Sequence, residues 1–141
     1  MNMFINDIVE GKIHVKYPCA VVFADLNGLK RVNDEQGHSE GDSMLKRAAE
    51  ILNQVFAGAL VYRAGGDEFM IIAPNADEAS IEAKLKEINK YADDEDGIHF
   101  AVGSYILHEG DDILTAMRKA DERMYLNKKA YYEAHPERKY R

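Results

Sequence analysis

The sequence predicts an α/β (α+β) sandwich, in which helices flank a mixed central sheet. Segments with helical periodicity alternate along the chain with short apolar runs, which is the pattern of a sheet covered by helices. The length of 141 residues suits one domain, and a hydrophobic content of 46% suffices for one core. We therefore expect residues 1–141 to form a single domain, with a frayed tail over 134–141.

The first half of the chain contains a buried strand and several helices. A short leading helix is expected over residues 2–14, and the continuous apolar run Ala20 to Ala24 predicts a central strand. A short helix follows around Leu29 to Asp34, and a longer one runs from about Gly41 to Phe56. Apolar residues in the longer helix recur every three or four positions, which predicts one buried face.

The second half alternates strands with two further helices. Asp77 is placed to cap the first of these helices, and Asp111 or Asp112 to cap the second. The expected strands are Leu60 to Arg63, Phe69 to Ala73 and Ile98 to Leu107. A compact glycine-containing turn separates the first two strands, which indicates a hairpin.

Charge and composition exclude several classes of function. The net charge of -7, from 25 acidic and 18 basic residues, argues against sequence-independent nucleic-acid binding, which needs a basic surface. Cys19 is the only cysteine, so no internal disulfide can form and a reducing compartment is indicated. No apolar run approaches the roughly 18 residues of a membrane span, and the N-terminus lacks the plan of a signal peptide. We expect a cytoplasmic protein with no direct membrane contact and no nucleic-acid partner.

Three carboxylates lie at the ends of predicted strands. Asp25 follows a buried strand, and Asp67 and Glu68 lie in the turn between two others. If these strands are neighbours, the carboxylates meet at one edge of the sheet, where they form the kind of ligand set that Mg²⁺ prefers. Two such ions can stabilise both the attacking and the leaving oxygen of a phosphoryl displacement. The plainer interpretation is a hairpin whose Asp-Glu pair faces water.

A second polar cluster lies in and after the short helix. Lys30 in its first turn can reach a phosphate, and the free N–H groups of the helix N-terminus favour the same ligand. Asn33 and Asp42 together can read a guanine edge, because a carboxylate accepts from N1–H and N2–H₂. Lys128 lies two helical turns after Asp121 and can also reach a phosphate. The alternatives are a helix stop at Asn33, a helix cap at Asp42 and a solvated lysine at position 128.

Three motifs along the chain occur together in one order. The first is Phe23 to Lys30, continued by Asn33-Asp34, Gly37-His38 and Gly41-Asp42. The second is Gly65-Gly66-Asp67-Glu68-Phe69, and the third comprises Ala120-Asp121, Met124-Tyr125 and Lys128. Over about residues 18 to 129 they resemble the motifs of the GGDEF family of bacterial diguanylate cyclases. The resemblance implies a fold like the polymerase palm and the class III nucleotidyl cyclases.

The resemblance implies a nucleotidyl transferase that condenses two GTP molecules into cyclic di-GMP and pyrophosphate. The 3′-hydroxyl of one GTP would attack the α-phosphorus of the other, twice, across a dimer of two such domains. Two Mg²⁺ or Mn²⁺ ions would serve each active site. The family's opening segment is not present in this chain, so a longer parent protein with a sensor domain is expected.

The resemblance assigns metal binding and catalysis by position. Asp25, Asp67 and the Leu26 carbonyl would bind metal, and Glu68 would hold the second ion. Asp67 would also promote attack by the 3′-hydroxyl. The catalytic set implied for this chain is therefore Asp67, Glu68 and Lys30.

The resemblance also assigns the substrate contacts. Asn33 and Asp42 would recognise guanine. Leu29, Lys30 and Lys128 would contact the phosphates. Together they make GTP the implied substrate.

The chain departs from the family pattern at several positions. Asn27 stands where the family often has an aspartate, and Tyr132 where it has a phosphate-binding arginine. Phe56 and Ala59 occupy the places of the Arg-x-x-Asp motif, so no inhibitory product site is expected. The missing arginine keeps a second hypothesis open, a regulatory module that binds GTP without turnover. A third, a cyclase that uses ATP, is disfavoured by Asp42, since adenine has no N1–H to donate.

Overall fold

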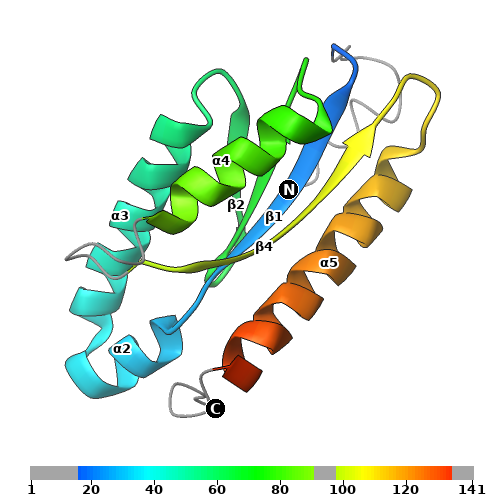
Figure 1. Cartoon of the computed structure of the whole chain (residues 1–141). Coiled ribbons are helices and arrows are strands. Elements are labelled where there is room, and N and C mark those ends of the chain that lie inside the picture. Colours follow the sequence, from blue (N-terminus) through cyan, green and yellow to red (C-terminus); the bar gives the residue numbers. More distant parts are fainter. Residues whose placement is uncertain (1–15, 91–97, 135–141) are drawn as a thin grey trace.

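Helices are interspersed with strands along the part of the chain that the computed structural model describes, residues 16–90 and 98–134 (Figure 1). In chain order they are β1 (Cys19–Leu26), α2 (Leu29–Gln36), α3 (His38–Val55), β2 (Leu60–Gly65), β3 (Glu68–Ala73), α4 (Glu78–Lys90), β4 (Phe100–Leu107) and α5 (Ile113–Ala134). The leading helix expected over residues 2–14 lies outside the described residues, as does the tail expected over 134–141 apart from Ala134.

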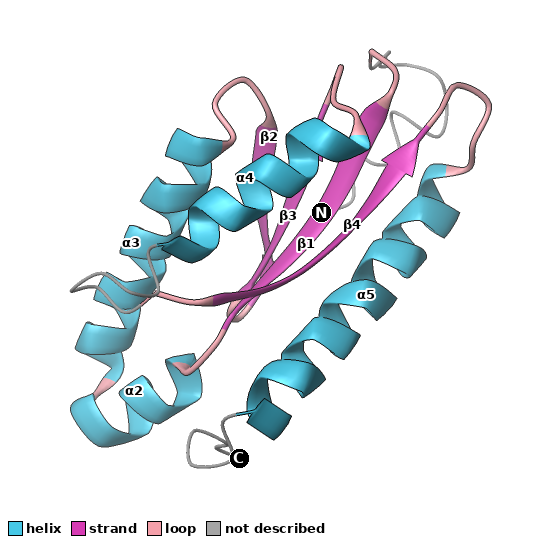
Figure 2. Ribbon diagram, in the orientation of Figure 1, coloured by secondary structure: helices cyan, strands magenta, loops and turns pink. Residues whose placement is uncertain are grey.

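The strands of the described residues form one four-stranded sheet in the order β2-β3-β1-β4 (Figure 2). All three neighbouring pairs in it are antiparallel. A crossover through α2 and α3 joins β1 to β2, and these two strands run in the same direction. Strand β3 lies between them, because the β2–β3 hairpin places β3 beside β1. The predicted α/β sandwich is confirmed. The parallel strands β1 and β2 are not neighbours, so each pair of neighbouring strands in this sheet is antiparallel.

Helices cover both faces of the sheet. Successive residues of a strand point to opposite faces. Val22 and Ala24 of β1 accordingly belong to the core shared with α3 and α4, whereas Val21 and Phe23 belong to the core shared with α5. Every residue of β1 is buried. Burial on both faces explains why this strand reads as a continuous apolar run in the sequence.

Helix α5 lies unusually close to β4. A Cβ at Gly103 of β4 would collide with the Ala120 carbonyl and the Met124 amide of α5. The absence of a side chain at this position therefore lets the backbone of the helix rest on the strand. α5 has 22 residues, yet no helix in the described ranges is long and apolar enough to cross a membrane.

Helix α3 begins earlier than its apolar periodicity predicted. It starts at His38 rather than near Gly41, and it is preceded by Gly37 with a φ of 94°. Asp42 therefore lies inside α3, so the interpretation of this residue as a helix cap is wrong. The first turn of α3 is polar and exposed, which is why apolar spacing did not reveal it.

Two helices begin at side-chain caps. The Ser80 amide donates to Asp77 Oδ1 at 2.9 Å, which confirms Asp77 as the cap of α4. Asp112 caps α5, because its carboxylate accepts from the Leu114 amide at 3.3 Å and from the Thr115 hydroxyl at 2.9 Å. These local contacts fix where the two helices start.

Candidate functional site

One edge of the sheet gathers the carboxylates found in the sequence. Asp25, near the end of β1, is the register partner of Glu68, the first residue of β3. On the other side of β1, Leu26 pairs with Phe100, the first residue of β4. Directly opposed side chains of an antiparallel pair lie on one face, with Cβ atoms about 4.5–5.5 Å apart. The structure therefore brings Asp25 and Glu68 together, on the face that α5 covers.

The turn between β2 and β3 is held against β1. The Leu26 amide donates to the Asp67 carbonyl at 2.8 Å. Arg63 donates from Nε and Nη2 to the Gly66 carbonyl, at 3.0 and 2.7 Å. Gly66 has a φ of 25°, which a side chain would disfavour. The sequence did not predict this role of Arg63, because the strand pattern does not show which side chain donates to the carbonyl of the turn.

Asp25 is a buried carboxylate with one cationic partner. It is 7% exposed, and its Oδ2 accepts from Lys128 Nζ at 2.9 Å. Oδ1 is buried and has no hydrogen-bond partner among the described residues. Burial raises the pKa of Asp25, the hydrogen bond from Lys128 opposes the rise, and the charge of Asp67 adds to it. One carboxylate oxygen of Asp25 is thus buried without a hydrogen-bond donor among the described residues.

Lys128 is the cation of this cluster. Burial acts to lower the pKa of Lys128, but the hydrogen bond and charge of Asp25 outweigh it, so the pKa lies above its ordinary value. Glu68 has a raised pKa because of burial first, and then because of the charges of Asp121, Asp25 and Asp67. Carboxylates therefore outnumber cationic groups in this set of interacting side chains, an arrangement that favours an added cation.

The oxygen donors at this edge suit a hard divalent cation. Asp25 Oδ1 and Asn27 Oδ1 are both buried and unpartnered within residues 16–90 and 98–134. Carboxylate and amide oxygens are the ligands that Mg²⁺ accepts, usually with several positions left to water or phosphate. No three His, Cys, Asp or Glu side chains in those ranges could hold a metal ion by themselves. The donor set thus fits a cation that is completed by backbone, water or substrate oxygens.

Helix α2 presents its N-terminus at the same edge. Gly28 is its N-cap residue, with a φ of 86°, and no side chain caps the helix. Free N–H groups at a helix N-terminus favour anions. Leu29 is 7% exposed and its side chain lies in the core, so only its backbone is available to a ligand. Lys30 follows in the first turn of α2, and its side chain falls outside what the structure describes.

Asn33 of α2 lies against Gly41 of α3 at the junction of the two helices. A Cβ at Gly41 would overlap the carboxamide of Asn33, so α3 passes closely over this side chain. Asp42, the next residue, is exposed and lines a cavity of about 420 Å³ together with Arg63 and Phe69. A carboxylate beside a cavity can accept hydrogen bonds from the N–H groups of a purine ring, and Asn33 lies one helix earlier, in α2.

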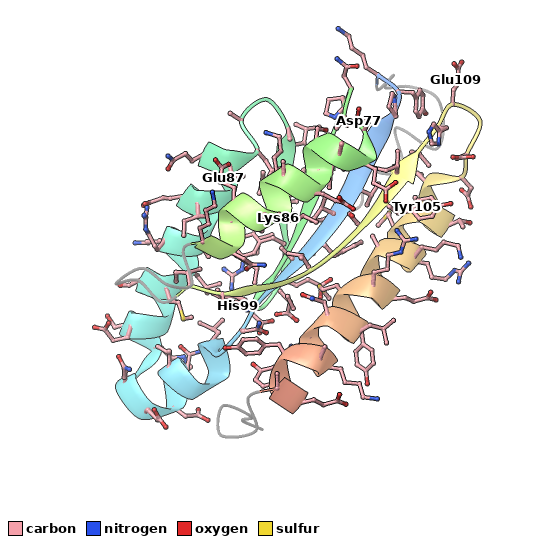
Figure 3. The ribbon with its side chains drawn as sticks, viewed as in Figure 1. Asp77, Lys86, Glu87, His99, Tyr105 and Glu109 are labelled. Carbon is pink, nitrogen blue, oxygen red and sulfur yellow. The ribbon has the colours of Figure 1, made fainter. Side chains whose placement is uncertain are left out.

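The end of α5 contacts the turn between β1 and α2. Burial raises the pKa of Tyr132, and the backbone of Gly28 and the charge of Lys128 oppose the rise. Tyr131 stacks on His99, with ring centroids 4.3 Å apart and an interplanar angle of 21°. His99, labelled in Figure 3 near the start of β4, accepts from Asn27 Nδ2 at 2.6 Å through Nδ1. Sequence reasoning missed these contacts, because the two tyrosines appear in the sequence only as departures from a motif.

The chain is similar in sequence to known signalling proteins. The signaling protein YkoW of Bacillus subtilis (strain 168) is 36% identical over 135 residues, which are 88% of this chain and 17% of that protein. The probable diguanylate cyclase DgcJ of Escherichia coli (strain K12) is 32% identical over 108 residues, which are 74% of this chain and 22% of that protein. The chain thus spans about a fifth of the length of these two relatives.

The fold is similar to that of a solved domain with a bound nucleotide. The GGDEF domain of DgcB from Caulobacter crescentus, in complex with c-di-GMP, is 25% identical, with a TM-score of 0.72 over 79% of this chain and 72% of that one. A family model described as "Diguanylate cyclase, GGDEF domain" matches residues 4–133. Given this match and the glycine turn that places Glu68 opposite Asp25, the chain belongs to the GGDEF domain family of diguanylate cyclases.

Proposed function

We propose that this chain is a diguanylate cyclase domain, which condenses two GTP molecules into cyclic di-GMP and pyrophosphate. The observation that carries the proposal is the register of Asp25 with Glu68, beside a buried Asp25 oxygen that has no partner in the described residues. Support also comes from DgcJ, named as a probable diguanylate cyclase, and from the DgcB domain with bound c-di-GMP.

Metal ions, two Mg²⁺ or Mn²⁺ in each site, would be held by the carboxylates of the sheet edge. Asp25, Asp67 and the Leu26 carbonyl would hold one ion, and Glu68 the other. When bound, such ions supply charge stabilisation to the attacking and leaving oxygens of a phosphoryl displacement. Asp67, in the turn held by Arg63, would promote attack by the 3′-hydroxyl.

The substrate would lie along the edge from α5 to α3. Lys30 and Lys128, with the backbone amide of Leu29, would bind the triphosphate. Asn33 and Asp42 would recognise guanine, because a carboxylate can accept hydrogen bonds from its N1–H and N2–H₂ groups. The cavity of about 420 Å³ that Asp42 lines supports this placement.

Catalysis would require two copies of the domain. Each copy would hold one GTP, so the 3′-hydroxyl of each nucleotide would meet the α-phosphorus held by its partner. We further propose that a sensor domain in a longer cytoplasmic or membrane-bound parent brings the two copies together, and that residues 1–141 act as one domain within it. A nucleic-acid partner and direct membrane contact form no part of the proposal.

Turnover by a forced dimer tests the proposal. The chain is fused to a dimerising coiled coil, incubated with GTP and Mg²⁺, and the products are separated by chromatography. Cyclic di-GMP is expected from the wild type, and Glu68→Gln, which keeps the shape of the side chain, is expected to make none. Bound GTP without any cyclic di-GMP from the wild type would sink the proposal.

A regulatory module that binds GTP without turnover is the second candidate. Two observations favour it: Tyr132 stands where the family has a phosphate-binding arginine, and Lys128 is engaged by Asp25 rather than free. Calorimetry that shows GTP binding by the forced dimer, together with no product after long incubation, would select this candidate over the cyclase.

A further inference from the structure

Strand β4 lies at one end of the sheet, so one side of its backbone faces away from the other described strands (Figure 1). Strand β1 pairs with its other side, from Cys19↔Leu107 to Leu26↔Phe100. An edge strand presents N–H and C=O groups to which a strand of another chain can add. The eight residues of β4 include neither a charged residue nor a proline. The strand itself therefore carries none of the residues that usually discourage such pairing.

Two side chains of α5 bind to the outer side of this strand. The Val102 amide donates to Asn127 Oδ1 at 2.9 Å, and Arg123 Nη1 donates to the Ser104 carbonyl at 2.6 Å. Residues two apart in a strand direct their backbone groups to the same side. Because these two groups bind α5 rather than β1, they face outward from the edge. The helix thus gives the strand one acceptor and one donor, as a neighbouring strand would.

The spacing of the two side chains matches that of the strand. Arg123 and Asn127 are four residues apart on α5, which is about 6 Å along a helix. Val102 and Ser104 are two residues apart on β4, which is about 6.6 Å along a strand. Gly103 lies between them, and a Cβ there would collide with the backbone of α5. The helix therefore lies close enough to β4 for both side chains to reach its edge.

A second contact orients Arg123. Its guanidinium carbon lies 5.4 Å from the centroid of the Tyr105 ring, and Tyr105 is labelled in Figure 3. A cation over an aromatic face is attracted by the ring, so the guanidinium is kept beside Ser104, the preceding residue of the strand. A positive charge along the edge also opposes pairing with a second edge of the same charge.

We propose that Arg123 and Asn127 take the place of a further strand at β4, and so prevent β4 of a second copy of this chain from pairing with it. The partner that they exclude is a second copy because a strand that pairs antiparallel with itself forms a closed two-fold dimer, the commonest symmetry of homo-oligomers. Such a dimer would join two four-stranded sheets into one. No nucleotide or metal takes part, so this role of α5 is independent of the proposed cyclase reaction.

Amide hydrogen exchange tests the contact at Asn127, by NMR in samples that sedimentation shows to be monomeric. In Asn127→Ala the Val102 amide loses its acceptor, and we expect it to exchange about 2- to 10-fold faster than in the wild type, the range that one hydrogen bond supports. Asn127→Asp is the matched variant, because it keeps an oxygen at the same position, and it should exchange like the wild type. Equal exchange of Val102 in the wild type and Asn127→Ala would overturn the proposal.

Self-association tests the consequence. In sedimentation velocity, the double variant Arg123→Ala/Asn127→Ala should form dimers at concentrations at least about 10-fold lower than the wild type does, since a partner strand then supplies the missing hydrogen bonds. Arg118→Ala is the matched control. It removes the same charge from the same helix, where the Arg118 side chain is 61% exposed and pairs with Glu122, and it should associate like the wild type.

The new dimer should protect the edge of β4. As the concentration of the double variant rises, exchange of its Val102 amide should slow again, because the partner strand supplies an acceptor. A double variant that stays as monomeric as the wild type would overturn the proposal, and so would a dimer in which Val102 still exchanges fast. If circular dichroism shows that the double variant does not fold, Asn127→Ala alone is judged by the same two measurements.

Discussion

At the scale of single residues, the sheet edge brings carboxylates together, and two of them, Asp25 and Glu68, have raised pKa values. Glu68 has a raised pKa because of burial and then because of Asp121, Asp25 and Asp67. Lys128 is the cation that the structure places against them. A raised carboxylate pKa means that the folded chain resists the charged form, so this cluster costs stability in the absence of a bound cation. Such a cost is common where a site is built for a ligand.

Replacing Asp25 should therefore separate stability from activity. In metal-free buffer with EDTA, we expect Asp25→Asn to leave the free energy of unfolding unchanged or to raise it by up to about 2 kcal/mol, because a repelled buried charge is removed. Turnover of GTP by the forced dimer should be lost. Urea denaturation measures the first effect, and product chromatography the second. A loss of stability well above 1 kcal/mol would mean that the pair with Lys128 outweighs the repulsion.

Cys19 offers a pH dependence that is separate from the site. Its thiol is fully buried at the start of β1, and burial raises its pKa from 9.0 to about 11. The folded chain therefore holds this proton more tightly than the unfolded chain does. The stability that it contributes is fully present below about pH 9 and is lost as the pH rises from there toward 11.

A comparison with Cys19→Ala isolates this contribution, since all other groups titrate in both proteins. Between pH 8 and pH 10, the wild type should lose about 1.4 kcal/mol more of its free energy of unfolding than the variant. Urea denaturation at a series of pH values measures the difference. Parallel pH profiles for the two proteins would show that the thiol is more solvated than its burial indicates.

At the scale of elements, the position of α5 determines whether the site exists. The helix contributes Lys128 to Asp25 and Tyr131 to His99, and both contacts depend on how closely it approaches the sheet. Gly103 sets that approach, because a Cβ there would collide with the backbone of α5. Backbone cannot move aside as a flexible side chain can, so the helix as a whole would have to shift.

Gly103→Ala should push α5 away from β4. We expect a loss of about 1–3 kcal/mol in the free energy of unfolding, which is typical of overpacking, and a larger loss of turnover, because Lys128 would move from Asp25. Gly65→Ala is the matched control for stability, since a Cβ there meets nothing within 4 Å. Equal stabilities for the two variants would mean that α5 adjusts to the extra methyl group without strain.

At the scale of the whole molecule, the proposed reaction needs two copies, so activity should depend on concentration. The free chain should show a specific activity that rises roughly in proportion to its concentration while monomers predominate, whereas the forced dimer should show a constant one. A dilution series of both proteins, assayed for cyclic di-GMP, tests this. A constant specific activity of the free chain, with sedimentation showing a monomer throughout, would contradict catalysis across a dimer.

The sequence predicted local elements well, because local signals act over a few residues. Apolar spacing located α3, and a side-chain cap located α4 at Asp77. It did not predict the order β2-β3-β1-β4, since pairing depends on distant partners that share the same apolar pattern. Apolar spacing does not reveal the polar start of α3, which is why the interpretation of Asp42 as a helix cap is wrong.

The amino-acid sequence by itself determined the class of fold, the identity of the motif residues and the likeness to the GGDEF family. Only the tertiary structure decided that Asp25 faces Glu68 across two strands, and that Lys128 reaches Asp25 from 103 positions away. It alone placed Tyr131 against His99. The physical reason is range: periodicity and caps are set within one or two helical turns, whereas these contacts arise from the packing of α5 on a sheet whose strands come from distant parts of the chain.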